Sequence, residues 1–129
     1  MTYCVEYPCR KPRRFYEDTA KEYKKRLSRY CKVQSPIKVN PVDDRDMVIA
    51  VSPDGMKISS EEMAKRLGQA ESGGDIARVI FILSPDITVR SNEKWALTQF
   101  DIPIDLQLVL ILEQLYRAQK ILHNEPYHK

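Results

Sequence analysis

Two continuous apolar runs, each of strand length, constrain the fold of this chain more than any other feature. The first, "MVIAV", spans residues 47–51 and is followed by "SPDG". The second, "RVIFIL", spans residues 78–83 and is followed by "SPD". Strands that are apolar at every position are typical of parallel sheets buried on both faces. We therefore predict an α/β fold with a parallel sheet and helices on both of its faces.

The segment between these runs has the signals of a helix. It begins with a capping box from Ser59 to Glu62 and stops at the glycine pair of residues 73–74. A strand, a helix and a strand over this length form a βαβ unit with a right-handed crossover. Parallel sheets bind ligands at the carboxyl ends of their strands, so a site is expected near Gly55 and Ser84.

The amino-terminal part adds a strand and a helix to this prediction. Residues 3–7 form a short apolar strand, and residues 15–30 repeat apolar side chains at helical spacing, with basic residues on the other faces. Residues 35–46 carry two prolines and an acidic cluster, as expected of an extended piece that leads into a surface loop. Trp95 and Phe100 are expected to fill space in the core.

A long helix is predicted over residues 104–123. Apolar residues almost encircle its first half, and a helix of this kind must be buried on nearly all sides. A single domain of 129 residues can hardly cover it alone. We therefore predict a homodimer in which this helix packs against the same helix of a partner.

The formal net charge of +3 conceals a basic segment. Residues 10–32 hold ten Lys or Arg against three Asp or Glu, whereas residues 40–62 hold two against six. Clustered cations bind the phosphates of a polyanion and release its counterions. The alternative is an ordinary solvated helix face, which charge alone favours.

Several classes of site and location are not expected. The longest apolar run, residues 108–112, is far shorter than the roughly 20 residues that cross a bilayer. The first residues lack the apolar stretch and cleavage site of a secretory signal, so a cytoplasmic location is expected. No CxxC pair occurs, and a disulfide framework or metal site is not expected from the available side chains, which are Cys4, Cys9, Cys31, His123 and His128.

The carboxyl-terminal string "EQLYRAQKILHNEPYHK" resembles a known family. It is similar to the end of the SPOUT-type methyltransferases of the ribosomal large-subunit RNA methyltransferase H family, which finish with a YRA helix and a PYH tail. "FYEDTAKEYKKRLSRY" resembles the first helix of that family, and "VIAVSPDGMKISSEEMAKRL" resembles its strand, glycine turn and helix start. The similarity covers most of the chain in the same order.

The resemblance implies one SPOUT domain over residues 1–129, with a trefoil knot near its carboxyl end, that forms a homodimer. It also implies binding of S-adenosylmethionine in the knot and methylation of a pseudouridine at N3 in large-subunit ribosomal RNA. General topology rules, which exclude knots, do not lead to this expectation.

Site residues follow from the resemblance in the same way. The cofactor would lie at the strand ends and beside the last helix, against Val51, Gly55, Leu83, Ser84 and Ile102. His128 is the candidate general base, because its reference pKa lies near 6.5, and Tyr127 is the candidate that orients the acceptor base. The alternatives are an ordinary "PDG" turn at Gly55, and a tail in which Tyr127 packs on a neighbouring helix.

The RNA-binding candidates are the cations of the basic segment and one arginine of the last helix: Arg10, Lys11, Arg13, Arg14, Lys24, Lys25 and Arg117. The alternative for Arg117 is an ion pair with Glu113, one helical turn earlier, and this alternative is slightly favoured.

The chain departs from the family pattern at three places. "SPDITVRSNEK" is short and contains no glycine, although the family has a glycine-rich cofactor loop there. Ile104 and Leu108 stand where the family has histidine and arginine, and Cys9, preceded by Pro8, stands where a glycine is expected. Three functions stay open: an active methyltransferase, an inactive dimeric homologue that binds RNA or the ribosome, and a structural dimer without a nucleic acid partner.

Overall fold

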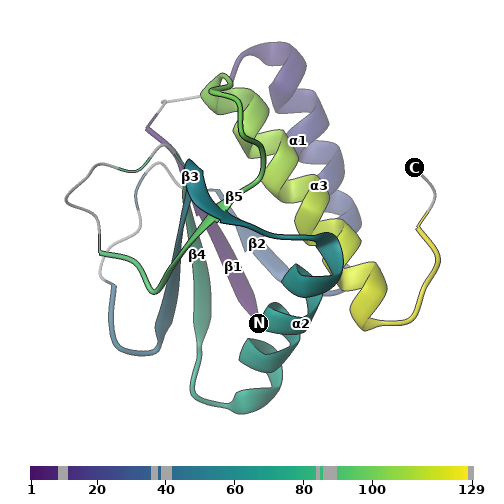
Figure 1. Ribbon diagram of the computed structural model, residues 1–129. Helices are drawn as coiled ribbons and strands as arrows, with labels where there is room; N and C mark the ends of the chain where they lie inside the picture. The colour runs from purple at the N-terminus through teal and green to yellow at the C-terminus, as the bar shows by residue number, and fades with distance from the viewer. Residues whose placement is uncertain (9–11, 36–37, 39–41, 84, 86–89, 128–129) are drawn as a thin grey trace.

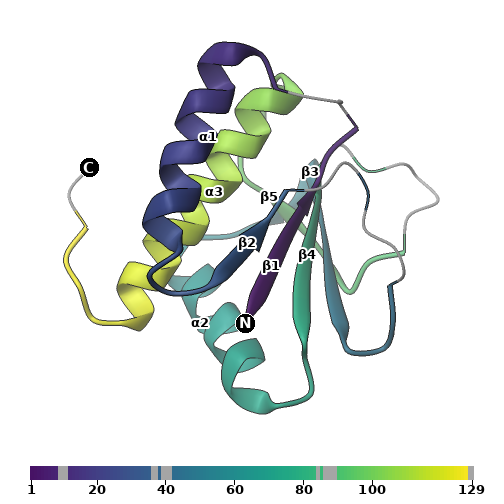
Figure 2. The ribbon, with the colours of Figure 1, turned by 180° about the vertical axis from the view of Figure 1, so that it is seen from behind.

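Five parallel strands form one sheet at the centre of the computed structural model, which describes residues 1–8, 12–35, 38, 42–83, 85 and 90–127. The strands are β1 (Thr2–Glu6), β2 (Lys32–Gln34), β3 (Asp46–Lys57), β4 (Arg78–Leu83) and β5 (Glu93–Ala96). Their order across the sheet is β2-β1-β4-β3-β5, and every pair of neighbours is parallel (Figure 2). The predicted parallel sheet is therefore confirmed.

The predicted βαβ unit is also confirmed. Helix α2 (Ser60–Gly73) connects β3 to β4, which are neighbours in the sheet. At its start, the Ser59 hydroxyl accepts a hydrogen bond from the Glu62 backbone N–H at 3.1 Å, while the Glu62 carboxylate turns to Arg66 at 3.0 Å. At its end, Gly74 has a φ of 79°, the left-handed conformation that favours glycine.

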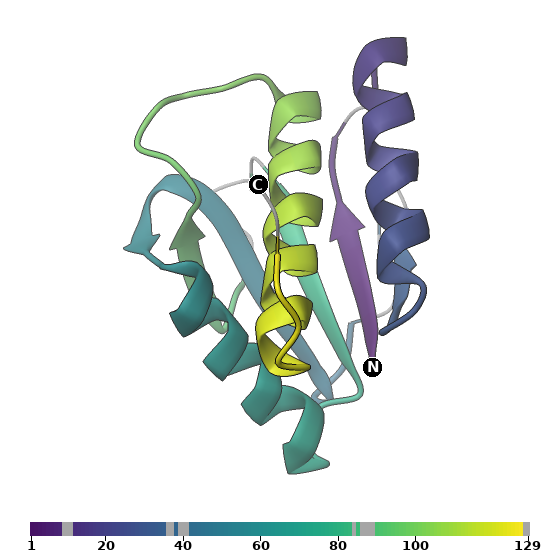
Figure 3. The same cartoon turned by 90° about the vertical axis from the view of Figure 1, so that its right-hand side faces the viewer.

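The prediction of helices on both faces of the sheet is wrong. The helices α1 (Arg14–Leu27), α2 and α3 (Ile104–Leu122) all pack on one face, with α3 between the other two (Figures 1 and 3). The buried residues of this main core include Tyr3, Phe81 and Trp95 from the sheet. A fully apolar strand shows that both of its faces are buried, but it does not show that a helix covers them.

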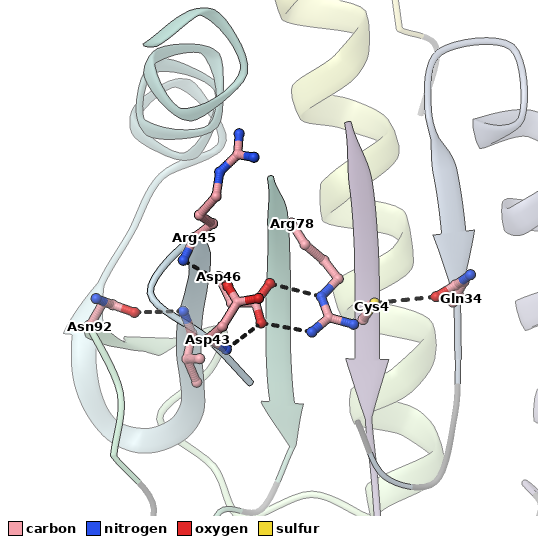
Figure 4. A network of polar contacts seen from close by, with 8 residues as sticks. Cys4, Gln34, Asp43, Arg45, Asp46, Arg78 and Asn92 are labelled. Carbon is pink, nitrogen blue, oxygen red and sulfur yellow. Dashed lines mark hydrogen bonds and ion pairs between the residues drawn. The ribbon is translucent and has the colours of Figure 1, made fainter. Parts of the chain in front are cut away.

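The other face of the sheet carries a small cluster and a polar network (Figure 4). Cys4, Val48 and Ile80 are buried there, and none of the described helices contributes to their cluster. Beside them, Arg78 donates two hydrogen bonds to the Asp46 carboxylate, at 2.8 and 2.7 Å. The Asp46 side chain is only 3% exposed, so this ion pair links β3 and β4 in a sheltered place.

Strand β3 is longer than the sequence predicts, because "SPDG" does not end it. The pairing of β3 with β5 shifts register between Val51 and Met56, and a bulge in the strand absorbs the residues that were expected to turn. A Cβ on Gly55 would lie 2.7 Å from the carbonyl carbon of Trp95 and 2.9 Å from that of Lys94. Glycine is thus required there for the close approach of β5, and the turn reading of Gly55 is wrong.

The long helix matches its predicted range to within one residue. Leu108, Ile111, Leu112 and Leu115 are buried against the sheet and the flanking helices. Leu106, Val109 and Leu110 are half-buried on the outer side, so the chain covers part of the apolar surface that predicted a dimer. The homodimer stays a prediction. No helix among the described residues is long and apolar enough to cross a membrane.

The two aromatic residues assigned to the core behave differently. Trp95 is fully buried, as predicted, and its indole N–H donates to Glu93 at 2.8 Å. Phe100 is 75% exposed, so its core assignment is wrong. It lies in the loop that precedes α3, where it rims the pocket described next.

Candidate functional site

A pocket lies beside the register shift of β3, next to the loop that follows β5. Its lining comes from β3 at its register shift, from the loop between β5 and α3, and from the first turn of α3: Val51, Ser52, Pro53, Leu97, Thr98, Phe100, Ile102 and Gln107. The cavity that they enclose has a volume of only about 10 Å³. Small-molecule sites usually offer about 300–1,000 Å³, so this cavity is far smaller than a ligand site.

The loop before α3 is organised by its own hydrogen bonds. The Phe100 backbone N–H donates to the Thr98 hydroxyl at 3.2 Å, and the Gln107 amide donates to the Ile102 carbonyl at 3.0 Å. These bonds hold the apolar side chains of Leu97 and Ile102 at the pocket while the ring of Phe100 stays exposed at its rim. None of the lining side chains carries a charge.

The predicted cofactor residues are only partly brought together. Val51 and Ile102 line the pocket, as predicted. Leu83 is buried in the main core, and Gly55 lies against the β5 backbone. Ser84 lies outside the described residues. Sequence reasoning missed the pocket residues Leu97, Thr98, Phe100 and Gln107, although the short loop before Pro103 was a signal for them.

The start of α3 is tied to the start of α1. Arg13 donates to the Asp105 carboxylate from Nε at 2.7 Å and from a terminal nitrogen at 3.1 Å. The Asp105 side chain is 8% exposed, and these hydrogen bonds hold its pKa below the ordinary value. Nearby, Ile104 and Leu108 pack into the core. Arg13 therefore already has an anionic partner, and the two aliphatic residues contribute packing.

The carboxyl-terminal tail folds back on α3. The chain leaves the helix through Asn124, whose φ of 53° is left-handed and reverses its direction. The Glu125 carboxylate then accepts hydrogen bonds from the Tyr30 hydroxyl at 2.8 Å and from the Lys120 ammonium at 3.0 Å. The tail, α3 and the turn after α1 are thereby joined at one point.

Tyr127 makes the second attachment of the tail. Its hydroxyl donates to the Glu113 carboxylate at 2.8 Å, and its ring meets that of Tyr116 edge to face at 5.5 Å. Arg117 pairs with the same carboxylate at 2.6 Å and lies 4.9 Å from the centre of the Tyr127 ring. Burial and the Glu113 carboxylate both raise the pKa of Tyr127. The ion-pair reading of Arg117 is confirmed, and Tyr127 packs on α3; His128 lies outside the described residues.

The predicted RNA-binding cations are spread along two helices. Arg14 and Lys25 are exposed on α1, and Lys24 is half-buried, so that desolvation lowers its pKa. Arg10 and Lys11 lie outside the described residues. Among the residues that the structure describes, no group of three His, Cys, Asp or Glu side chains is placed to hold a metal ion.

Comparisons with known proteins identify close similarity along the chain. A family model described as "Predicted SPOUT methyltransferase" matches residues 35–128. The "Ribosomal RNA large subunit methyltransferase H 1" of Thermoanaerobacter sp. (strain X514) is 36% identical, with all of both chains covered. The "Ribosomal RNA large subunit methyltransferase H" of Clostridium novyi (strain NT) is 35% identical over 84% of this chain and 87% of its own.

Proposed function

Because the chain belongs to the ribosomal RNA large subunit methyltransferase H family of SPOUT methyltransferases, we propose that it transfers a methyl group from S-adenosylmethionine to large-subunit ribosomal RNA. The acceptor is N3 of a pseudouridine, as the resemblance implies. The observation that carries the proposal is the apolar pocket beside β3 and β5, which includes two of the predicted cofactor residues, Val51 and Ile102. Carboxyl ends of parallel strands are the usual place for such a ligand.

The pocket residues have distinct roles in this proposal. Val51, Leu97 and Ile102 would supply the apolar surface that holds the adenine, with the exposed ring of Phe100 at its rim. When bound, S-adenosylmethionine supplies an activated methyl group. The protein then has to align the acceptor nitrogen and remove its proton.

In this proposal, residues of the tail and of the basic helix α1 bind the RNA that accepts the methyl group. His128 takes the N3 proton, since a reference pKa near 6.5 suits a general base, and Tyr127 orients the base. Exposed Arg14 and Lys25 bind phosphates of the RNA. Their contribution falls steeply with salt, because bound phosphates release counterions.

The quaternary part of the proposal is a knotted homodimer in the cytoplasm. The half-buried outer side of α3, with Leu106, Val109 and Leu110, supports a partner helix there. Sedimentation velocity at micromolar protein tests this part directly, and a monomer would refute it.

A second candidate is an inactive homologue that binds RNA or the ribosome without methylating it. Three observations favour it: the pocket is small, its lining side chains carry no charge for the methionine end of the cofactor, and Leu108 is buried where the family has arginine. The two candidates make opposite predictions for cofactor binding.

Calorimetric titration with S-adenosylmethionine and S-adenosylhomocysteine separates them. Micromolar binding, about −8 kcal/mol, supports the enzyme and leads to methyl-transfer assays on large ribosomal subunits. Phe100→Ala should weaken binding, whereas Phe15→Ala is the matched control, because Phe15 is 77% exposed on α1 and does not line the pocket. No heat at millimolar ligand refutes the enzyme and leaves the binding homologue.

A further inference from the structure

The tail after α3 is attached to the rest of the protein at two points, and the proposed function gives no role to these attachments. Glu125 is bound by Tyr30 and Lys120, and Tyr127 is bound by Glu113. Lys120 and Glu113 are separated by about 10 Å along the helix axis at 1.5 Å per residue. From Glu125 to Tyr127, an extended chain advances by about 7 Å. The tail therefore runs antiparallel to α3, and the Tyr127 side chain spans the remaining distance to Glu113.

Glu113 is the shared acceptor of the second attachment. One carboxylate oxygen accepts from Arg117, at 2.6 and 3.2 Å, and from the Tyr127 hydroxyl at 2.8 Å. The other oxygen accepts from the Gln114 amide at 2.8 Å. The side chain is only 15% exposed, so water competes little for these bonds. A carboxylate can satisfy all of these donors because it only accepts hydrogen bonds.

An amide at the same position would satisfy these groups less well. Glutamine has a single oxygen, so if that oxygen keeps Arg117 and Tyr127, its NH₂ group faces the Gln114 amide, which would have to turn over and exchange its hydrogen bond from Ser60. The negative charge that faces the Arg117 guanidinium would be lost in every arrangement. The site therefore favours a carboxylate at 113.

We propose that Glu113 is a positioning residue for the methyl transfer, acting through Tyr127 and Arg117. This inference rests on the proposed function, in which Tyr127 orients the acceptor base; Arg117 takes part through its contacts with Glu113 and with the Tyr127 ring. Without an anchor, the segment after α3 would have to be ordered again in each productive encounter. Glu113 removes this cost by holding the phenol and the guanidinium in one arrangement before RNA arrives.

The test combines kinetics with a direct measurement of tail docking. The variants are Glu113→Ala, Glu113→Gln, Tyr127→Phe and the double variant Glu113→Ala/Tyr127→Phe. Glu22→Ala is the matched control, because it removes an i,i+4 pair with Arg26 on the exposed surface of α1. The protein has seven tyrosines, so ¹⁹F NMR after 3-fluorotyrosine labelling resolves Tyr127, and the Tyr127→Phe spectrum assigns its signal.

Glu113→Ala should shift the Tyr127 signal toward that of an exposed ring and lower kcat by about 10- to 100-fold, the scale of a misplaced group. The KM for S-adenosylmethionine should stay within about twofold, since the pocket is unchanged. Glu113→Gln should lose most of the rate as well, and the double variant should be little worse than Glu113→Ala, because the two residues act as one unit. Glu22→Ala should behave as the wild type.

The outcomes separate this inference from the proposed function. Full activity in Glu113→Ala, or a Tyr127 signal that does not move, would overturn the positioning role while the methyltransferase proposal stands. Additive losses in the double variant would also overturn it, because Glu113 would then act independently of Tyr127. A wild-type protein that transfers no methyl group to any large-subunit acceptor would overturn both.

Discussion

Replacing Gly55 with alanine tests whether β5 depends on the close approach described for the bulge in β3. The added Cβ would lie 2.7 Å from the Trp95 carbonyl carbon and 2.9 Å from the carbonyl carbon and oxygen of Lys94. Ordinary contacts begin at 3.4 Å, so the neighbouring backbone must retreat by about 0.7 Å, the difference between 3.4 and 2.7 Å, to restore one. These are backbone atoms of a paired strand, so rotating a side chain cannot relieve the clash.

The size of the effect follows from three contributions. Overpacking typically costs about 1–3 kcal/mol. The retreat also strains the ladder at Met56 and Lys57, at about 1 kcal/mol for each hydrogen bond lost. The reduced entropy of the unfolded chain returns about 0.4–1 kcal/mol. With both hydrogen bonds lost, we therefore expect Gly55→Ala to lower the free energy of unfolding by roughly 2–5 kcal/mol, a large part of the 5–15 kcal/mol typical of a domain.

The assay is urea denaturation followed by tryptophan fluorescence. Trp95 is the single tryptophan of the chain, it is fully buried, and it contributes to the clash itself. Its emission should therefore shift in the folded state as well as on unfolding. Gly73→Ala is the matched control: nothing lies within 4 Å of the added Cβ, and a gain of about 0.4–1 kcal/mol is expected.

Unchanged stability of Gly55→Ala, together with an unchanged folded emission spectrum, would refute the reasoning. It would mean that β5 does not lie against Gly55 in solution. The reading of Gly55 as a residue that presents its backbone to the cofactor would then regain its place, and calorimetry on the same variant would measure that contribution.

Three further predictions concern other parts of the chain. Ser59→Ala should lower the free energy of unfolding by about 1 kcal/mol in urea denaturation, because it removes the cap of α2. The hydrogen bonds from Arg78 lower the pKa of Asp46 in the folded state. The carboxylate therefore stabilises the protein above its unfolded pKa of about 4, and this contribution is lost as the pH falls through the lower folded pKa. Below about pH 4, the urea midpoint of Asp46→Asn should therefore depend less on pH than the midpoint of the wild type. Arg14→Ala with Lys25→Ala should weaken binding to ribosomal RNA and reduce the salt slope by about 2, measured by fluorescence anisotropy, whereas equal slopes in variant and wild type would exclude phosphate contacts at these two residues.

Local signals in the sequence were enough to predict the central βαβ unit and the long helix. The apolar runs, the Ser59 cap and the glycine pair act within one element, and the structure follows them. Strand β5 was missed because its four residues become a strand only by pairing with β3. The side of the sheet covered by each helix is also decided by long-range packing, which an apolar run does not encode.

In the candidate site, too, contacts within one helix were predictable from the sequence and contacts between distant segments were not. The pair of Glu113 and Arg117 was predictable from its i,i+4 spacing. The contact between Glu113 and Tyr127 spans 14 residues and depends on the reversal at Asn124, which periodicity does not predict. Phe100 was assigned to the core by residue type alone, although the loop that carries it leaves the ring exposed.

The order of strands in the sheet has a consequence for synthesis of the chain. β1 precedes the other strands in the sequence, yet its Thr2 pairs with Arg78, 76 residues later. At a translation rate of about 5–20 residues per second, about 4–15 s separate the synthesis of these two pairing partners. β3, α2 and β4 can associate with one another as they emerge, because they are adjacent in sequence. We therefore expect the sheet to begin at β3 and β4 during synthesis, and β1 to pair with β4 only after that strand is complete.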